Sequence, residues 1–154
     1  MKTTRHFIIF IIAMLLSIPA ASMCHAYSGQ YNFRHLDSND GLSANNVKCI
    51  VRDRLGFMWF GTKNGLNRYD GSKIKVYNCY DEALGRGNNN IGALYEDENS
   101  MLWIGTDRGI YRYDPHADVI THVESKADDG VEAGNWVQRI TGDRKGTIWA
   151  ALPR

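Results

Sequence analysis

The chain has 154 residues, of which 44% are hydrophobic, 11% aromatic and 23% charged. Without its first 26 residues it carries 16 Lys and Arg against 17 Asp and Glu, so its charge gives no reason to expect nucleic acid as a partner. Abundant aromatic residues and the absence of low-complexity tracts exclude a disordered linker.

Residues 1–26 are predicted to be a signal peptide. A basic start precedes an apolar stretch over residues 7–18, which at 12 residues is too short to span a membrane comfortably, and small residues follow it. We favour cleavage after Ala26. Cys24 raises the alternative of lipid attachment, although the methionine directly before it fits that signal poorly. The mature chain, 27–154, is therefore expected in the periplasm.

A motif recurs three times in the mature chain, with copies separated by 44 and then 46 positions. A period in the 40s with several short strands per unit is typical of propeller blades. The sequence predicts an all-β fold, a partial β-propeller of four-stranded antiparallel blades, with repeats over about 40–78, 87–123 and 134–154. The residues that define the repeat are Asp53, Gly56, Trp59, Gly61, Asp97, Trp103, Gly105, Asp143, Gly146 and Trp149.

The first two copies contain the signals for all four strands of a blade, in order, and the third copy begins in the same way. The first strands carry apolar residues three positions apart, in Val47-x-x-Ile50, Ile91-x-x-Leu94 and Val137-x-x-Ile140. Aromatic and β-branched runs predict second strands at 57–62 and 101–106, third strands at 66–69 and 110–113, and fourth strands at 73–78 and 119–123. Gly65 and Gly109 are expected at the hairpin turns between second and third strands. About two and a half blades result.

The repeated Asp and Trp have structural explanations. Asp53 is predicted to accept hydrogen bonds from backbone N–H groups of the next turn, where Gly56 tolerates a positive φ. Ser100 replaces that glycine in the second copy, so the turn there is expected to differ. A ligand contact is the alternative role for the Trp, but we favour inter-blade core, with Trp59 and Trp103 shielded from solvent in matching strands.

Residues 31–36 have the register of a fourth strand with no blade in front of it. Such an N-terminal orphan strand is expected to complete the last blade of a ring. The connections between blades are predicted as loops at 37–46, 80–90 and 124–135. Cys49 and Cys79 are expected to be free, buried or half-buried thiols, because three strand spacings of about 4.8 Å separate their strands.

The loops that lead into the first strands are candidates for a ligand-binding surface. Amide side chains can hydrogen-bond sugar hydroxyls, and an indole can stack on a pyranose ring. The alternative is that the Asn residues adopt left-handed turn conformations, which we favour. The candidate residues are Asn45, Asn46, Asn88, Asn89, Asn90, Asn135 and Trp136.

The sequence contains no nucleophile elbow, phosphate-binding glycine loop, zinc spacing or calcium loop. An enzyme of the quinoprotein or sialidase propeller type is an alternative, although the Asp, Gly and Trp spacings differ from those repeats. A scaffold that binds proteins and no small ligand is a further alternative. We predict no catalytic residue, no metal and no cofactor.

The pattern Asp-x-x-Gly-x-x-Trp-x-Gly-Thr-x-x-Gly-Leu-x-Arg-Tyr-Asp at 53–70, preceded by Asp40-Gly41-Leu42-Ser43-x-Asn45-x-Val47, resembles the two-component regulator propeller repeat. The likeness covers residues 31–150. The third copy departs from it, because Ala151 and Leu152 stand where Gly-Thr is expected.

The resemblance implies the N-terminal part of the exported sensor region of a hybrid two-component histidine kinase. It further implies an oligosaccharide ligand, the remainder of the receptor propeller as a partner, a homodimer of the full-length receptor and an inner-membrane anchor. Because propellers close with at least about four blades, residues 27–154 alone are expected to be insoluble, self-associated or partly unfolded, and to bind no oligosaccharide tightly.

Fusion of residues 1–40 to an export-dependent reporter should give periplasmic activity and a shortened product, because the apolar stretch directs export. Reporter activity and product mass provide the measurement. A cytoplasmic, uncleaved fusion would contradict the signal-peptide prediction.

Overall fold

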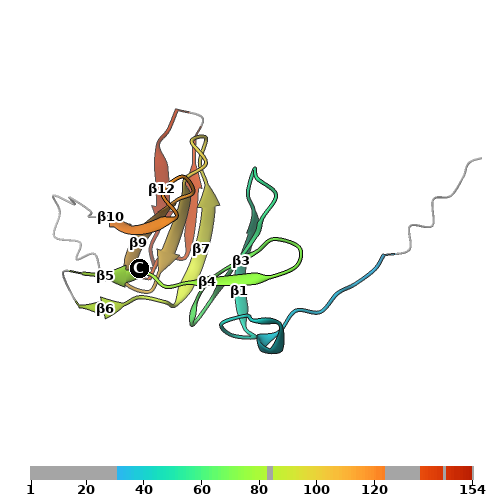
Figure 1. Ribbon diagram of the computed structural model, residues 1–154. Helices are drawn as coiled ribbons and strands as arrows, with labels where there is room; N and C mark the ends of the chain where they lie inside the picture. Colours follow the sequence, from blue (N-terminus) through green and yellow to red (C-terminus); the bar gives the residue numbers. More distant parts are fainter. Residues whose placement is uncertain (1–30, 83–84, 124–135, 144, 154) are drawn as a thin grey trace, which may run out of the picture. The chain divides into compact units, whose positions relative to one another are not determined.

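The computed structural model describes residues 31–82, 85–123, 136–143 and 145–153 (Figure 1). The predicted signal peptide and Asn135 lie outside these residues. The chain divides into a short N-terminal unit and a second unit, His35–Arg154, which contains every strand of the described residues.

Two four-stranded antiparallel meanders confirm the prediction of propeller blades. Blade 1 contains β1 (Val47–Arg52), β2 (Met58–Thr62), β3 (Gly65–Tyr69) and β4 (Ile74–Tyr77), in that spatial order. Blade 2 contains β7 (Ile91–Glu96), β8 (Leu102–Thr106), β9 (Gly109–Asp114) and β10 (Val119–Val123), again in order. Blade 3 contains the antiparallel pair β11 (Arg139–Gly142) and β12 (Ile148–Ala151).

Three connecting segments differ from expectation. Residues 31–36, predicted as an orphan strand, form no strand, because the described residues offer no last blade with which they could pair. The loop at 37–46 contains a short 3-10 helix, η1 (Ser38–Asp40), capped by Asp37. The loop at 80–90 contains a small hairpin of β5 (Tyr80–Asp81) and β6 (Arg86–Gly87).

A β-bulge explains why the apolar residues of the first strands β1 and β7 are three positions apart. In blade 2 the pairing with β8 shifts between Ile91 and Ala93, so that one extra residue is accommodated there. Side chains alternate along a regular strand, but a bulge restores the same side after three positions. Ile91 and Leu94 accordingly pack together in the core shared with blade 1, whereas Ala93 packs toward blade 3.

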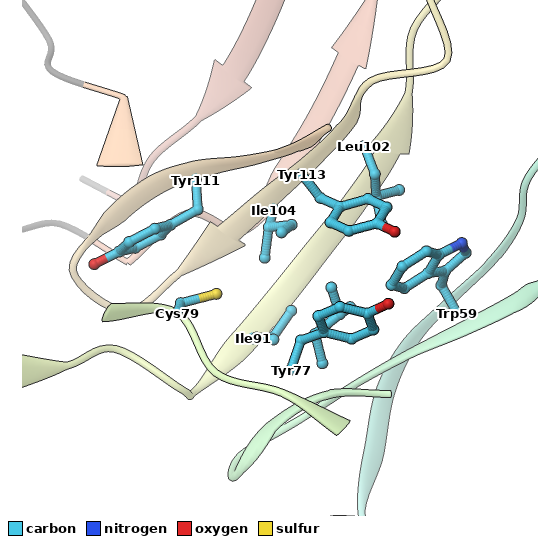
Figure 2. Close-up of a cluster of buried hydrophobic side chains, with 9 residues drawn as sticks. Trp59, Tyr77, Cys79, Ile91, Leu102, Ile104, Tyr111 and Tyr113 are labelled. Carbon is cyan, nitrogen blue, oxygen red and sulfur yellow. The ribbon is translucent and has the colours of Figure 1, made fainter. Parts of the chain in front are cut away.

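Each blade therefore has two distinct faces. We call the face toward the preceding blade the leading face; it carries Ile91 and Leu94 in blade 2, and Val137 and Ile140 in blade 3. The opposite, trailing face carries the repeated Trp and Gly. The core between blades 1 and 2 is formed by buried residues of both, shown in Figure 2: Trp59, Leu66, Tyr77, Cys79, Ile91, Leu102, Ile104, Tyr111 and Tyr113.

Aromatic rings fill one end of this core. The Trp59 ring lies 4.9 Å from Tyr113 and 5.6 Å from Tyr77, measured between centroids, and all three meet at tilted or edge-on angles (Figure 2). Such pairs add about 0.5–1.5 kcal/mol each beyond the area that they bury. Trp59 is 1% exposed, and Trp103, in the matching strand, is partly buried.

The glycine of the repeated Gly-Thr motif allows consecutive blades to approach closely. A Cβ atom at Gly61 would lie 2.7 Å from Ile91 Cγ2, and one at Gly105 would lie 2.6 Å from Val137 Cγ1. Both distances are too short for a methyl group. The leading face of the next blade occupies the space of a side chain at both positions, and at Gly61 the Cys49 thiol of the same sheet does so as well.

The threonine of the same motif holds the turn between second and third strands. Thr62 Oγ1–H donates to Gly65 O at 3.1 Å, and Thr106 Oγ1–H donates to Gly109 O at 3.0 Å. Gly65 and Gly109 have φ values of 141° and 130°, as expected of hairpin glycines.

The prediction that Ser100 changes the turn between first and second strands is wrong. The Gly56 N–H donates to Asp53 O at 3.0 Å, and the Ser100 N–H donates to Asp97 O at 3.1 Å, so both turns close in the same way. Ser100 has a φ of 62°. The backbone of Ser100 thus has the positive φ of the left-handed region, which costs about 1–2 kcal/mol in a residue with a Cβ.

Substitution of Gly61 by Ala should destabilise the junction of blades 1 and 2 by about 1–3 kcal/mol, the usual cost of overpacking. The buried Cys79 thiol reports on opening of this junction, so its alkylation rate in 27–154 should rise about fivefold or more. Peptide mass spectrometry gives the rate for each cysteine. Gly105→Ala is the matched control, because it perturbs the next junction and should leave Cys79 protected; equal rates in both variants would contradict the assignment.

Candidate functional site

The repeated Asp holds the turn between the first and second strands and also the Trp. The Phe57 N–H donates to Asp53 Oδ1 at 2.8 Å, and Trp59 Nε1–H donates to Asp53 Oδ2 at 2.7 Å. Trp103 Nε1–H donates in the same way to Asp97 Oδ2 at 2.8 Å. Both oxygens of each carboxylate thus bind groups of their own turn, as expected for a structural residue.

The third copy repeats the turn. The N–H groups of Lys145 and Thr147 donate to Asp143 Oδ1 at 2.8 and 2.9 Å, and Gly146 has a φ of 86°. Trp149 differs from its counterparts, because it is 62% exposed. The described residues contain no following leading face to cover it.

Two of the candidate ligand residues are used inside the fold. Asn88 is 2% exposed, and its side-chain amide donates to the Tyr111 hydroxyl. Its backbone N–H donates to Cys79 O at 2.8 Å, while the Cys79 N–H donates to Asn89 Oδ1 at 2.9 Å. Asn88 and Asn89 therefore fasten the connection that leads into β7.

Asn45 also has a local structural role. Its Oδ1 accepts a hydrogen bond from the Ser38 N–H at 2.8 Å, which ties η1 to the start of β1. Asn46 is exposed directly before β1.

The remaining two candidates, Asn90 and Trp136, are brought together by Lys48. Lys48 Nζ–H donates to Asn90 Oδ1, and the same ammonium lies 5.8 Å from the centroid of the Trp136 ring. Asn90 Nδ2–H donates to Asp107 Oδ2 at 3.3 Å. A Cβ atom at Gly92 would lie 2.7 Å from Trp136 Nε1, so the missing side chain provides the space for the indole. We call these five residues the Trp136 cluster.

Lys48 was not singled out from the sequence, although the repeat contained a signal for it. Lys48 and Gly92 occupy the same position in successive copies, the extra residue of the bulge. Asn46 and Asn90 directly precede β1 and β7, and Trp136 holds the equivalent place in the third copy, before Val137. Aligning the copies at the bulge places these residues at one end of neighbouring strands. The indole of Trp136 is 46% exposed there.

A polar clamp around the Tyr77 and Tyr113 hydroxyls of the aromatic core joins blades 1 and 2. The Tyr77 and Tyr113 hydroxyls donate to Asp118 Oδ1 at 2.7 and 2.9 Å, and Lys75 Nζ forms an ion pair with Asp118 Oδ2 at 2.6 Å. Arg68 donates to the Tyr113 hydroxyl at 3.1 Å. The sequence gives no local signal for this clamp, because its members come from three strands and one turn of two copies.

The clamp shifts the acidity of its members. The hydrogen bond from Lys75, followed by those from Tyr77 and Tyr113, holds the pKa of Asp118 well below its usual range. Burial is the main cause that raises the pKa of Tyr77 and of Tyr113. Asp118 is thus ionised at neutral pH, whereas both phenols keep the protons that they donate to it.

Cys49 and Cys79, the cysteines of the described residues, are free thiols, as predicted. Burial raises the pKa of Cys49 to about 11 and that of Cys79 to about 12. Neither thiol is a nucleophile at neutral pH in the closed structure, because the thiolate is the reactive form.

A pocket of about 300 Å³ lies between the first turns of blades 2 and 3, where Asp97, Asn99 and Asp143 line it together with Lys145. Within the described part of the chain, no group of three or more His, Cys, Asp and Glu side chains is placed to hold a metal ion. Among the helices of the described residues, none is long and apolar enough to cross a membrane.

Comparison with protein families identifies the repeat. Residues 41–64 and 85–108 match the family described as two component regulator propeller. The chain is 38% identical over 64 residues to histidine kinase P4 from Formosa agariphila, an alignment that covers 42% of this chain and 5% of that protein.

Solved structures support the same assignment. The extracellular domain of a protein described as a hybrid two-component system of B. thetaiotaomicron superimposes with a TM-score of 0.64 and 25% identity, over 76% of this chain and 17% of that chain. A second extracellular domain from that organism gives a TM-score of 0.61 and 26% identity, over 73% of this chain and 16% of that chain. The chain spans less than a fifth of the length of these relatives.

Substitution of Asp118 by Asn should destabilise the junction of blades 1 and 2 at neutral pH. The folded-state pKa of Asp118 is depressed, so its contribution is fully present above the unfolded carboxyl pKa of about 4 and is lost as the pH falls toward the folded value. Urea midpoints of the wild type and the variant, followed by tryptophan fluorescence, should therefore differ at neutral pH and approach each other progressively as the pH falls below about 4. A difference that stays constant from pH 7 to pH 2 would contradict this role.

Proposed function

Because the chain carries two-component regulator propeller repeats, we propose that it belongs to the periplasmic ligand-sensing propeller of a hybrid two-component receptor. The extracellular domains that it resembles come from proteins described as hybrid two-component systems, and the similar curated protein is a histidine kinase. In this proposal, residues 1–26 direct export, and an inner-membrane anchor and the kinase lie elsewhere in the receptor. The receptor acts as a homodimer.

We further propose that the ligand is an oligosaccharide and that the Trp136 cluster contacts it. The observation that carries this step is the exposed indole of Trp136, seated over Gly92 beside the Lys48 ammonium and the Asn90 amide. A flat apolar ring supplies a surface for the apolar face of a pyranose. Neighbouring donors and acceptors then fix its orientation through the hydroxyl groups.

The proposed surface, the Trp136 cluster, keeps Asn90 and Trp136 of the residues expected from the sequence. Asn88 and Asn89 are withdrawn from it, since their side chains hold the connection before β7. Lys48 and Asp107 are added to it, because both bind Asn90 through their side chains.

Saturation-transfer NMR of the complete receptor propeller that contains this chain, with a panel of plant, algal and animal oligosaccharides, tests this proposal. The method detects ligands with dissociation constants on the order of 1 mM or tighter. Trp136→Ala and Asn90→Ala should each reduce the transferred signal of the bound sugar several-fold, because the stacking surface or its neighbouring hydrogen bonds are lost.

Trp149→Phe is the matched control, since Trp149 is also exposed but lies outside the cluster. It should leave the transferred signal unchanged. Saturation transfer to no sugar of the panel would overturn the oligosaccharide proposal, and a signal insensitive to Trp136→Ala would remove the Trp136 cluster from the site.

A further inference from the structure

Lys48 carries a positive charge that no carboxylate of the described residues neutralises. Its ammonium donates to the neutral amide oxygen of Asn90 and lies 5.8 Å from the centroid of the Trp136 ring. Lys75, by contrast, forms an ion pair with Asp118 at 2.6 Å, and this is the only ion pair among the residues that the structure describes. Because an ammonium has three N–H donors and no acceptor, Lys48 can still bind an anionic group from outside the chain.

Asn90 holds the Lys48 ammonium in one place. Asn90 Nδ2–H donates to Asp107 Oδ2 at 3.3 Å, and the Asp107 N–H donates to Asn90 O at 3.1 Å. Asp107 thereby orients the amide so that its Oδ1 accepts from Lys48. A long side chain that is already held in this way loses less conformational freedom when it binds a ligand.

The indole of Trp136 reaches from the third copy across β7 to Lys48. A Cβ atom at Gly92 would lie 2.7 Å from Trp136 Nε1 and 3.1 Å from Val137 O, so the glycine provides the space in which the indole lies. The ring remains exposed on its other side. A sugar stacked on the ring would therefore lie beside the Lys48 ammonium.

The indole N–H groups of the chain differ in the same way as the two lysines. Those of Trp59 and Trp103 donate to the carboxylates of Asp53 and Asp97 at 2.7 and 2.8 Å. No group of the described residues accepts a hydrogen bond from Trp136 Nε1–H. The Trp136 cluster thus presents donors, one of them charged, for which the described part of the chain supplies no anionic acceptor.

We propose that the oligosaccharide bound at the Trp136 cluster is anionic, and that the Lys48 ammonium binds a carboxylate or sulfate group next to a sugar ring stacked on Trp136. Hydrogen bonds of this charge-assisted kind are roughly twice as strong as those between neutral groups. This inference rests on the proposed function, because it assigns the chemical class of the sugar at the same site. Lys48 is then the residue that determines the preference for a charged sugar.

Isothermal titration of the complete receptor propeller that contains this chain compares oligosaccharides that differ only in charge. Oligogalacturonates and their methyl esters test a carboxylate, sulfated and desulfated galactan oligosaccharides test a sulfate, and neutral xylan and cellulose oligosaccharides complete the panel. In at least one pair, the anionic member should bind at least about tenfold more tightly. This advantage should shrink when NaCl is raised from about 20 mM to about 500 mM, because salt screens exposed charges. The pair that shows the advantage identifies the anionic group.

Variants of two lysines test whether Lys48 is the cause. Lys48→Met should lower the affinity for the anionic sugar to that for its uncharged counterpart, whereas Lys48→Arg should keep the advantage. Lys73→Met is the matched control, because Lys73 directly precedes β4 at the other end of blade 1 and forms no ion pair among the described residues. It removes the same charge and should leave the advantage unchanged. Protection of Cys79 from alkylation verifies that each variant keeps its first junction.

The outcomes separate this inference from the proposed function. Neutral sugars that bind as tightly as their anionic counterparts would overturn the inference alone. So would an advantage that survives in Lys48→Met or that falls equally in Lys73→Met. Binding of no sugar of the panel, charged or neutral, would overturn both the inference and the oligosaccharide proposal.

Discussion

The close approach of one blade to the glycine of the preceding blade is the constraint on which the rest of this structure depends. Ile91 and Val137 occupy the space where Gly61 and Gly105 have no side chain. Packing at this distance removes water from both sheets and lets the large indole fill the neighbouring volume. Because burial of apolar area is the main source of stability, a blade without a neighbour loses much of the buried area that stabilises it.

Several other features depend on this contact. The bulge in β7 turns Ile91 and Leu94 toward blade 1, while Ala93 between them faces blade 3, and β1 contains a bulge at the same place. Asp53 and Asp97 accept hydrogen bonds from the indole Nε1–H groups of Trp59 and Trp103, so that each ring is held in place under the next blade. Thr62 and Thr106 close the hairpin beside the glycine. The repeated residues thus shape the trailing face of a blade so that the next blade can pack against it.

The connections between blades are fastened by chemistry that differs from copy to copy. In blade 1, the Ser43 N–H donates to Asn67 Oδ1 at 2.8 Å, and Asn67 is fully buried. Tyr111 holds the equivalent place in blade 2 and accepts a hydrogen bond from Asn88. Different residues therefore hold the segment that leads into each first strand. For this reason, an Asn in such a loop cannot be assigned to ligand binding from its residue type alone.

The sequence by itself determined the blade architecture, the strand order, the free cysteines and the structural place of the repeated Asp and Trp. These features depend on local patterns, such as strand-forming runs, turn glycines and the repeat period, which recur from one copy of the motif to the next. Only the tertiary structure decided the rest. The loop residues Asn88 and Asn90 look alike in the sequence, yet one amide is buried and the other lies beside Lys48, because each depends on side chains from elsewhere in the fold. The clamp at Asp118 and the reason for Gly61 are likewise contacts between residues about 30 to 45 positions apart, and no local pattern encodes a distance across two sheets.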